Sequence, residues 1–443
     1  MDSAFEHHNA FRLFSNADAM KLVRRANHEY WYWTDLKHRQ FPPDSTAADI
    51  WAVIKIYRSS SLKELSIDGV PSCKFLYQVT EQTVEKLHRF DMYMGGILQA
   101  DTLIPADDKN RYLVSSIMEE AIASSQLEGA ATTREVAKDM LRKQRKPRNH
   151  SERMIYNNYQ TIQYILANKD QELTPEMLCQ IQAKMTLDTL SNPDHTGRFR
   201  QNDDVRVEDF TTGEVVHIPP AQKHLKALLE WYCDFANEAV NGAGKEGASG
   251  FIHPIVRACI LHFLLGYIHP FADGNGRTAR AVFYWYLLRK GYWLLEYMSI
   301  SRIIHKSAAQ YSKAYLFTEY DDNDLTYFIN YQVKTLDLAF TSLQLYIERK
   351  VSEKKQLRAF RYIVGLNERQ TGMVQDLLAD PDAEWTIQEA QQRFGIVYQT
   401  ARTDLMRLEE LGLVESRRIG KAKLAYRRVA DFDGVVARLQ QRQ

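Results

Sequence analysis

Apolar residues recur at spacings of three and four over long stretches of the chain, which is the spacing of one face of an α-helix. Glycine and proline are sparse, with 20 and 12 in 443 residues, so few points interrupt these stretches. Thr174, Pro175 and Glu176 form a typical helix start, with an N-cap, a proline at the first helical position and an acid in the first turn. The pattern predicts a mainly α fold.

The main exception to the helical pattern is residues 205–218. Two valine-rich runs there flank the turn residues Thr211, Thr212 and Gly213. Short β-branched runs around such a turn predict one β-hairpin.

Residues 366–430 have a different pattern, with shorter apolar segments separated by turn residues. A helix at about 367–378 leads to the turn residues 380–382, and a capping box from Thr386 to Glu389 opens a second helix. A third helix follows, and two short apolar runs then bracket the basic turn at 417–421. Three helices followed by a hairpin are the layout of a winged helix-turn-helix domain.

The length is too great for one ordinary core, so we expect several domains. Residues 1–100 are read as an N-terminal helical region, in which some of the consecutive aromatic residues 30–33 contact another domain. Residues 101–345 are expected to form a helical core, residues 346–365 a charged helical connector, and residues 366–443 the winged helix-turn-helix domain.

Composition narrows the class of protein. An apolar content of 45% excludes a disordered chain, and a net charge of +1 means that nucleic-acid binding requires a local patch. The four cysteines lie far apart without a CxxC motif, which indicates neither a zinc site nor a disulfide framework and fits a reducing compartment. The N-terminus lacks the apolar core of a signal peptide, and the longest apolar stretch, 258–268, is too short to cross a bilayer. We therefore expect a cytoplasmic protein.

The most informative stretch is residues 269–280, with the sequence HPFADGNGRTAR. An apolar helix leads into it, and Pro270 disfavours helix at the preceding residue, so the helix should stop at His269 and leave its imidazole facing a pocket. Gly274 and Gly276 remove side chains where the backbone approaches another group closely or takes a positive φ.

A new helix is expected to begin near Asn275, and its first amides form an anion site. Arg277 and Arg280 are three residues apart and project from the same side of that helix. Asp273 is a hard oxygen ligand beside them, which suits Mg²⁺ shared with phosphates. Together these residues predict a phosphate-handling site.

The plainest alternative is a glycine-rich turn with incidental charges, and the separate use of each residue in phosphate chemistry argues against it. The chain has no GxxxxGK[ST] run, which excludes a Walker A loop. No strand precedes the glycines, which disfavours a dinucleotide fold.

The segment from His269 to Arg280 resembles the Fic family signature, HPFxDGNGRxxR, at every fixed position. The resemblance implies transfer of AMP from ATP to a hydroxyl side chain of a target protein. It also implies a Fic-type helical core with one β-hairpin, called the flap, and the hairpin at 205–218 lies in the right order for it.

The resemblance assigns a role to most residues of the signature. His269 would be the general base that takes the proton of the target hydroxyl, and Asp273 would hold Mg²⁺ against the α- and β-phosphates. The remaining residues would bind the phosphates: Gly274, Asn275 and Gly276 in the anion hole, Arg277 on phosphate oxygens and Arg280 on the γ-phosphate.

Upstream, the run SSQLEG at 124–129 resembles the family's inhibitory motif, [S/T]xxxE[G/N], with Ser124, Glu128 and Gly129 matching. The resemblance implies an inhibitory helix at about 115–130, whose glutamate pairs with Arg280 in the place of the γ-phosphate. The alternative is a solvated acid at a helix end.

The resemblance also suggests how the target protein and the adenine of the nucleotide are held. The flap of the family pairs with the target backbone as an added strand. A tyrosine at the position of Tyr311 frames the adenine in relatives, whereas the asparagine often found eight residues later is replaced here by Glu319. The alternative for Tyr311 is ordinary helix packing.

Residues 386–430 carry a local net charge of +4, from nine basic and five acidic residues. The basic residues are Arg393, Arg402, Arg407, Arg417, Arg418, Lys421, Lys423, Arg427 and Arg428. DNA binding and protein docking both remain open for this domain, and so does a homodimer of the whole chain.

The leading hypothesis is a self-inhibited protein adenylyltransferase that uses ATP and Mg²⁺. One alternative is a winged-helix transcription regulator with a nucleotide-sensing pocket. Another is a de-AMPylase that uses Glu128.

Overall fold

A computed structural model describes residues 10–43, 45–67, 70, 73–95, 109–209, 212–238, 251–361, 366–379, 383–418 and 424–441. The chain divides into two compact units, Met1–Leu343 and Gln344–Gln443. Helix α16 (Thr326–Arg361) contains the boundary between them. The domain boundaries expected near residues 100 and 365 fall outside the described residues.

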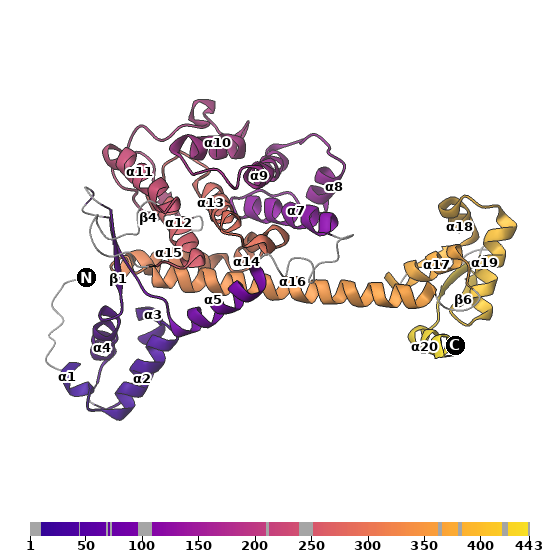
Figure 1. The fold of residues 1–443 in the computed structure, drawn as a ribbon, viewed down its shortest axis with the longest axis horizontal. Helices are drawn as coiled ribbons and strands as arrows, with labels where there is room; N and C mark the ends of the chain where they lie inside the picture. The colour runs from indigo at the N-terminus through magenta and orange to yellow at the C-terminus, as the bar shows by residue number, and fades with distance from the viewer. Residues whose placement is uncertain are drawn as a thin grey trace. The chain divides into compact units, whose positions relative to one another are not determined.

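The first unit is mainly helical, as the apolar spacing predicted (Figure 1). Its N-terminal helices are α1 (Ala10–Leu13), α2 (Ala17–His28), α3 (Trp33–Leu36), α4 (Ala47–Ser59) and α5 (Glu81–Met94). The helices that follow are α7 (Lys109–Leu127), α8 (Arg134–Arg142), α9 (His150–Ala167), α10 (Pro175–Thr186), α11 (Leu225–Ala236), α12 (Pro254–Ile268), α13 (Asn275–Arg289), α14 (Ile300–Lys306) and α15 (Ala308–Tyr320). Short 3₁₀ turns lie at η2 (Pro193–His195), η3 (Gln222–His224) and η4 (Trp293–Tyr297).

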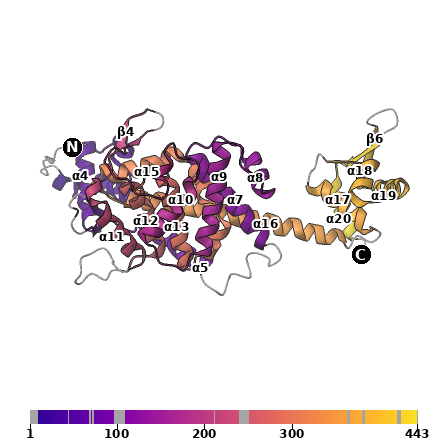
Figure 2. The ribbon, with the colours of Figure 1, turned by 90° about the horizontal axis from the view of Figure 1, so that it is seen from above.

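Helices α12 and α13 lie at the centre of the first unit and are buried along nearly their whole length. They pack on each other, while α9 and α10 cover α13 and α11 covers α12 (Figures 1 and 2). A helix surrounded on all sides is apolar all round, which explains why α12 shows no polar face. The turn between α12 and α13 and the start of α13 hold the signature residues.

The predicted hairpin is present but short. Strand β3 (Val207–Glu208) pairs antiparallel with β4 (Val215–His217), and Gly213 between them has a φ of +69°. Thr211 of the predicted turn lies outside the described residues.

A second hairpin, β1 (Lys63–Ser66) with β2 (Lys74–Tyr77), lies in the N-terminal region that we expected to be helical. Its strands have four residues each, too few for a clear alternation of apolar and polar positions. Leu65 and Phe75 face each other and are fully buried, and Phe75 meets Tyr267 of α12 edge to face. Contacts with distant residues therefore stabilise these strands.

The consecutive aromatic residues near the N-terminus divide between two environments. The Tyr30 hydroxyl donates to Asp324 at 2.5 Å, and the Tyr32 ring stacks on Phe317 with centroids 4.0 Å apart. Trp31 instead packs into the small core that α2 and α4 form. Two of these residues thus attach the N-terminal helices to the segment that contains α15 and the start of α16.

The second unit contains α17 (Glu368–Ala379), β5 (Glu384–Thr386), α18 (Ile387–Phe394), α19 (Tyr398–Glu410), β6 (Val414–Arg418), β7 (Leu424–Arg428) and α20 (Phe432–Gln441). The strands form an antiparallel sheet in the order β5-β7-β6. The capping box at Thr386 forms as expected, whereas β5, which ends at Thr386, was not predicted. The expected turn at 380–382 and residues 419–421 of the basic turn lie outside the described residues.

No helix among the described residues has both the length and the apolar character needed to cross a membrane.

We predict that Arg58→Ala destabilises the first unit. The Arg58 side chain is buried, and its guanidinium donates to the Asn27 side chain at 3.0 Å, the Tyr327 hydroxyl at 2.7 Å and the Trp31 carbonyl at 2.8 Å. Because truncation removes this donor from the buried Tyr327 hydroxyl and Trp31 carbonyl, we expect the free energy of unfolding to fall by about 3 kcal/mol. Urea unfolding followed by tryptophan fluorescence measures it, since six of the seven tryptophans precede residue 344.

The matched control is Arg25→Ala, which removes an exposed ion pair between Arg25 of α2 and Glu29, the residue that follows this helix. Exposed ion pairs contribute little to stability, so Arg25→Ala should lower the free energy of unfolding by less than about 1 kcal/mol. Equal effects of the two variants would contradict this account of Arg58.

Candidate functional site

His269 follows the last residue of α12 and has φ +47° and ψ +60°. This left-handed conformation is uncommon for a residue with a side chain and marks strained backbone at functional sites. The imidazole Nδ1 lies 3.1 Å from the Gly266 carbonyl oxygen. Because a carbonyl only accepts, Nδ1 carries the proton and Nε2 is left able to accept one.

Burial lowers the pKa of His269 to about 4, against the Gly266 hydrogen bond, which raises it. Among the charged groups nearby, His217 and Arg200 lower the pKa further, and Glu128 raises it. At neutral pH the imidazole is therefore neutral, which is the form that a general base requires.

The side chain of Asn275 holds the signature loop together. Its Oδ1 accepts from the Phe271 N–H and its Nδ2 donates to the Phe271 carbonyl, both at 2.9 Å. Phe271 is itself buried and stacks on Phe199. The Asn275 side chain is thus engaged within the loop, and the anion-hole role of this residue stays a prediction for its backbone N–H.

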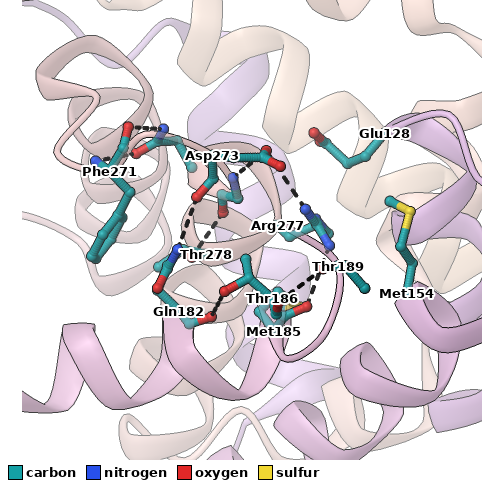
Figure 3. A network of polar contacts seen from close by, with 12 residues as sticks. Glu128, Met154, Gln182, Met185, Thr186, Thr189, Phe271, Asp273, Arg277 and Thr278 are labelled. Atoms are coloured by element: carbon teal, nitrogen blue, oxygen red, sulfur yellow. Dashed lines mark hydrogen bonds and ion pairs between the residues drawn. The ribbon is translucent and has the colours of Figure 1, made fainter. Parts of the chain in front are cut away.

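Helix α10 supports the loop from below (Figure 3). The Gln182 side chain donates to the Asp273 carbonyl at 3.1 Å. Gly274 caps α13 with a φ of +86°, and a Cβ there would lie 2.8 Å from Thr186. Glycine is needed at this position for both reasons.

Asp273 presents its carboxylate at the loop surface, with 57% of the side chain exposed. Its Oδ1 accepts from the Gly274 N–H at 2.5 Å and lies 3.7 Å from an Arg277 nitrogen. The described residues contain no cluster of three His, Cys, Asp or Glu side chains that would hold a metal unaided. A single exposed carboxylate does fit Mg²⁺ that is also bound by substrate phosphates.

Arg277 is buried beside this carboxylate (Figure 3). Its Nη1 donates to the Met185 carbonyl at 3.3 Å, and its Nε is buried without a hydrogen-bond partner among the described residues. A buried donor without a partner is costly, so this guanidinium is poised to bind an anion.

Arg280, one turn further along α13, is only 4% exposed. Its Nε donates to the Ser124 hydroxyl at 2.8 Å and its Nη2 to the Ser124 carbonyl at 3.0 Å. The same Nη2 donates to Glu128 Oε1 at 2.9 Å. Two of the three inhibitory-motif residues therefore bind the arginine that the resemblance assigns to the γ-phosphate.

The Glu128 carboxylate lies over the first turn of α13, since a Cβ on Gly276 would be 2.5 Å from Glu128 Oε1. Burial raises the pKa of Glu128, but the charges of Arg280 and Arg277 outweigh it and hold that pKa below its usual value. The carboxylate is thus ionised at neutral pH and occupies a helix N-terminus, where anions bind.

Gly129 makes the backbone turn that follows α7, with a φ of +89°. This role of Gly129 is conformational and does not depend on a contact with Arg280. The glycine instead lets the chain leave the helix directly after Glu128.

Tyr311 lies on α15 with its hydroxyl 2.9 Å from Nε2 of the buried His262. Burial raises the pKa of Tyr311 and lowers that of His262, so both side chains are neutral. The charge of Arg280 lowers the pKa of both groups, but burial is the larger effect on each. The role of Tyr311 at the adenine stays a prediction.

Sequence reasoning missed Gln182, Arg200 and His217, which all contact the signature loop or the end of α12. The His217 ring, on β4, lies 2.7 Å from Glu319 Oε2 through Nδ1 and 2.7 Å from the Tyr267 carbonyl through Nε2. Glu319, at the position where relatives often have asparagine, is therefore paired with the flap. No local pattern marks these residues, because their partners are remote in sequence.

In the second unit, several arginines of the predicted basic patch are paired with acids. The ion pairs are Arg393–Asp376, Arg407–Glu410, Arg417–Glu384 and Arg427–Glu415. Lys421 and Lys423 lie outside the described residues. Val397, which precedes α19, and Tyr398, its first residue, expose apolar side chains. The net charge of +4 already includes Glu410 and Glu415, whereas Asp376 and Glu384 lie outside residues 386–430 and offset two further arginines.

Comparison with known proteins gives a family match for part of the first unit. Residues 172–287 match the model of the Fic/DOC family. "Protein adenylyltransferase Fic" of Drosophila willistoni is 33% identical over 101 residues, which cover 23% of this chain and 17% of that protein. The protein of the same name from Nematostella vectensis is 35% identical over 106 residues, covering 23% and 20%.

The chain therefore matches about a fifth of the length of these curated relatives. Among solved structures, a Fic family protein from Desulfovibrio desulfuricans G20 shares 18% identity with a TM-score of 0.49. That match covers 78% of this chain and 94% of the other.

We predict that His269 of the nucleotide-free protein titrates near pH 4. The measurement is NMR of histidine-labelled protein, with the resonance assigned by its loss in His269→Ala. Because Glu128 raises this pKa, Glu128→Gly should move the titration to still lower pH. A midpoint near the ordinary value of about 6.5 would contradict the burial of the imidazole.

Proposed function

We propose that the chain is a self-inhibited protein adenylyltransferase, because residues 172–287 match the Fic/DOC family model and are similar to protein adenylyltransferase Fic. It transfers AMP from ATP to a hydroxyl side chain of a target protein. One observation supports the proposal most strongly. A neutral imidazole and two buried arginines lie on one loop and the start of the helix that follows it.

In the proposed reaction, the target hydroxyl gives its proton to Nε2 of His269, while Nδ1 stays bound to the Gly266 carbonyl. The hydroxyl oxygen forms a bond to the α-phosphorus, and the bond from that phosphorus to the bridging oxygen breaks. Pyrophosphate leaves with the electron pair. The protein contributes orientation and charge rather than covalent chemistry.

The phosphates are proposed to bind at the N-terminus of α13, where backbone N–H groups of the first turn are available. Arg277 uses its unpartnered buried Nε on phosphate oxygens, and Arg280 takes the γ-phosphate. Asp273 would hold Mg²⁺, which neutralises phosphate charge when it is bound.

Self-inhibition is proposed to act through competition for Arg280. The Glu128 carboxylate and the γ-phosphate would be alternative anionic partners of the same guanidinium. While Glu128 stays in place, its charge also repels a triphosphate at the start of α13. ATP then binds without its α-phosphorus aligned with His269.

Target docking is proposed to use the flap as a strand template, because such an edge binds extended backbone. Val215 of β4 and the following Ile218 expose apolar side chains beside that edge. The interaction would depend little on the target sequence.

We predict that Glu128→Gly increases self-modification with AMP by about 10- to 100-fold. A hydrogen bond between charged groups contributes about 1.5–3 kcal/mol, and removing it frees Arg280 for the nucleotide by that amount. Intact mass after incubation with ATP and Mg²⁺ measures the gain of AMP.

The control is Glu128→Gly combined with His269→Ala, which should gain no AMP. Transfer that persists in the double variant would show that His269 is not the base. No transfer in any form, with ATP bound in calorimetry, would favour the alternative of a nucleotide sensor.

DNA binding by the second unit is proposed to be weak, because Asp376 and Glu384 pair with Arg393 and Arg417 and reduce an already modest positive charge. We predict no binding of mixed duplex at micromolar protein and 0.15 M salt by fluorescence anisotropy, where the Debye length is about 8 Å. Sub-micromolar binding that weakens steeply with salt would instead support a DNA-binding winged helix.

A further inference from the structure

Arg200 lies between the flap and the signature loop, with a side chain that is 2% exposed. Its backbone N–H donates to the Pro270 carbonyl at 2.8 Å. Its Nε donates to the His269 carbonyl at 3.1 Å. The residue therefore contacts two successive peptide groups at the position of the proposed base.

The other guanidinium nitrogens of Arg200 bind both ends of the segment that contains the flap. Nη1 donates to the Asn202 carbonyl at 3.0 Å and to Asp203 Oδ1 at 3.1 Å, and Nη2 donates to the Pro220 carbonyl. Asp203 Oδ1 also accepts from the Gln222 N–H at 2.6 Å. One buried side chain thus joins the start of the flap, the end of the flap and the His269 peptide.

We propose that Arg200 is a positioning residue that fixes the flap relative to His269, so that a target strand on the flap is held in register with the base. The inference rests on the proposed function and deepens it. Arg200 does not touch the reacting groups; it acts through the His269 peptide and the flap backbone.

The conformation of His269 explains why such a residue is needed. A left-handed non-glycine residue is unfavourable by about 1–2 kcal/mol, so the surrounding structure must hold it. A hydrogen bond to the His269 carbonyl fixes the orientation of that peptide and with it the direction of the imidazole. Misplacement of a reacting group by about 1 Å can slow a reaction about 100-fold.

Arginine suits this position better than lysine. Its planar guanidinium has five N–H donors in a rigid arrangement, whereas an ammonium has three on a flexible stem. Four of the contacts described for Arg200 are to backbone carbonyls, counting the one made by its own N–H. Two further contacts near Arg200 restrict movement of the flap and the loop. Phe199 stacks on Phe271, and His217 binds the Tyr267 carbonyl.

The first test is hydrogen exchange of the full chain, measured by mass spectrometry, for Arg200→Lys and Arg200→Ala. We expect faster exchange in both the flap, residues 205–209 and 212–218, and the signature loop, residues 269–275. The matched control is Arg198→Ala, an exposed arginine two residues earlier, which should change neither segment. Faster exchange in only one segment, or in neither, would overturn the inference.

The second test is the rate of AMP transfer in the Glu128→Gly background. Arg200→Ala should lower kcat by about 10- to 100-fold with the KM for ATP unchanged, because the phosphate-binding arginines are untouched. Arg200→Lys should recover part of the rate, whereas Arg198→Ala should retain all of it. An unchanged kcat, or a loss seen equally as weaker ATP binding, would contradict a positioning role.

The two tests separate the two proposals. If Glu128→Gly alone transfers no AMP, the proposed function fails, and hydrogen exchange still decides whether Arg200 couples the flap to the loop. If Arg200→Ala does not fold, the lysine variant carries both measurements.

Discussion

A guanidinium buried as deeply as that of Arg280 must have an anionic or strongly polar partner, because an isolated charge inside a protein costs several kcal/mol. In this structure Ser124 and Glu128 provide that partner from outside α13. The absence of a side chain at Gly276 leaves room for the carboxylate over the helix start. Any ligand that displaces Glu128 must therefore bring its own negative charge to the same place.

This requirement links inhibition to substrate choice. A triphosphate satisfies it and an uncharged ligand does not, so the contact that blocks the proposed site also selects for the proposed substrate. The ionised state of Glu128 depends on the two arginines, and its loss of charge at low pH would weaken the contact. The proposed brake and the proposed phosphate site are thus one electrostatic arrangement.

A second constraint concerns the backbone around His269. The loop holds the backbone of His269 in a left-handed conformation, and the side chains of three other residues stabilise the surrounding peptides. Asn275 binds Phe271, Gln182 binds the Asp273 carbonyl, and Arg200 binds the His269 carbonyl. The catalytic geometry proposed here therefore depends on side chains that bind the loop backbone rather than the substrate.

The sequence alone predicted the features of the site that depend on neighbouring residues. Pro270 indicated the end of α12 and Asn275 the start of α13, because proline and helix-start rules act locally. The meeting of Glu128 with Arg280 could not be worked out from spacing, since more than 150 residues separate them, and it rested on the family resemblance.

Other features could not be predicted at all, for physical reasons. The strands β1, β2 and β5 have three or four residues and are stabilised by distant partners rather than by their own propensity. Arg200 looks like any arginine in a polar stretch until the fold brings the loop beside it. For Asn275, the sequence did not distinguish a backbone role from a side-chain role.

The most direct test of the central claim is a pair of crystal structures, wild type and Glu128→Gly, each with a non-hydrolysable ATP analogue and Mg²⁺. The account predicts that in the variant the γ-phosphate contacts Arg280 where Glu128 lies now, with the α-phosphorus facing His269 Nε2. In the wild type the triphosphate should lie displaced from Arg280. The same phosphate position in both structures, or a γ-phosphate away from Arg280 in the variant, would contradict it.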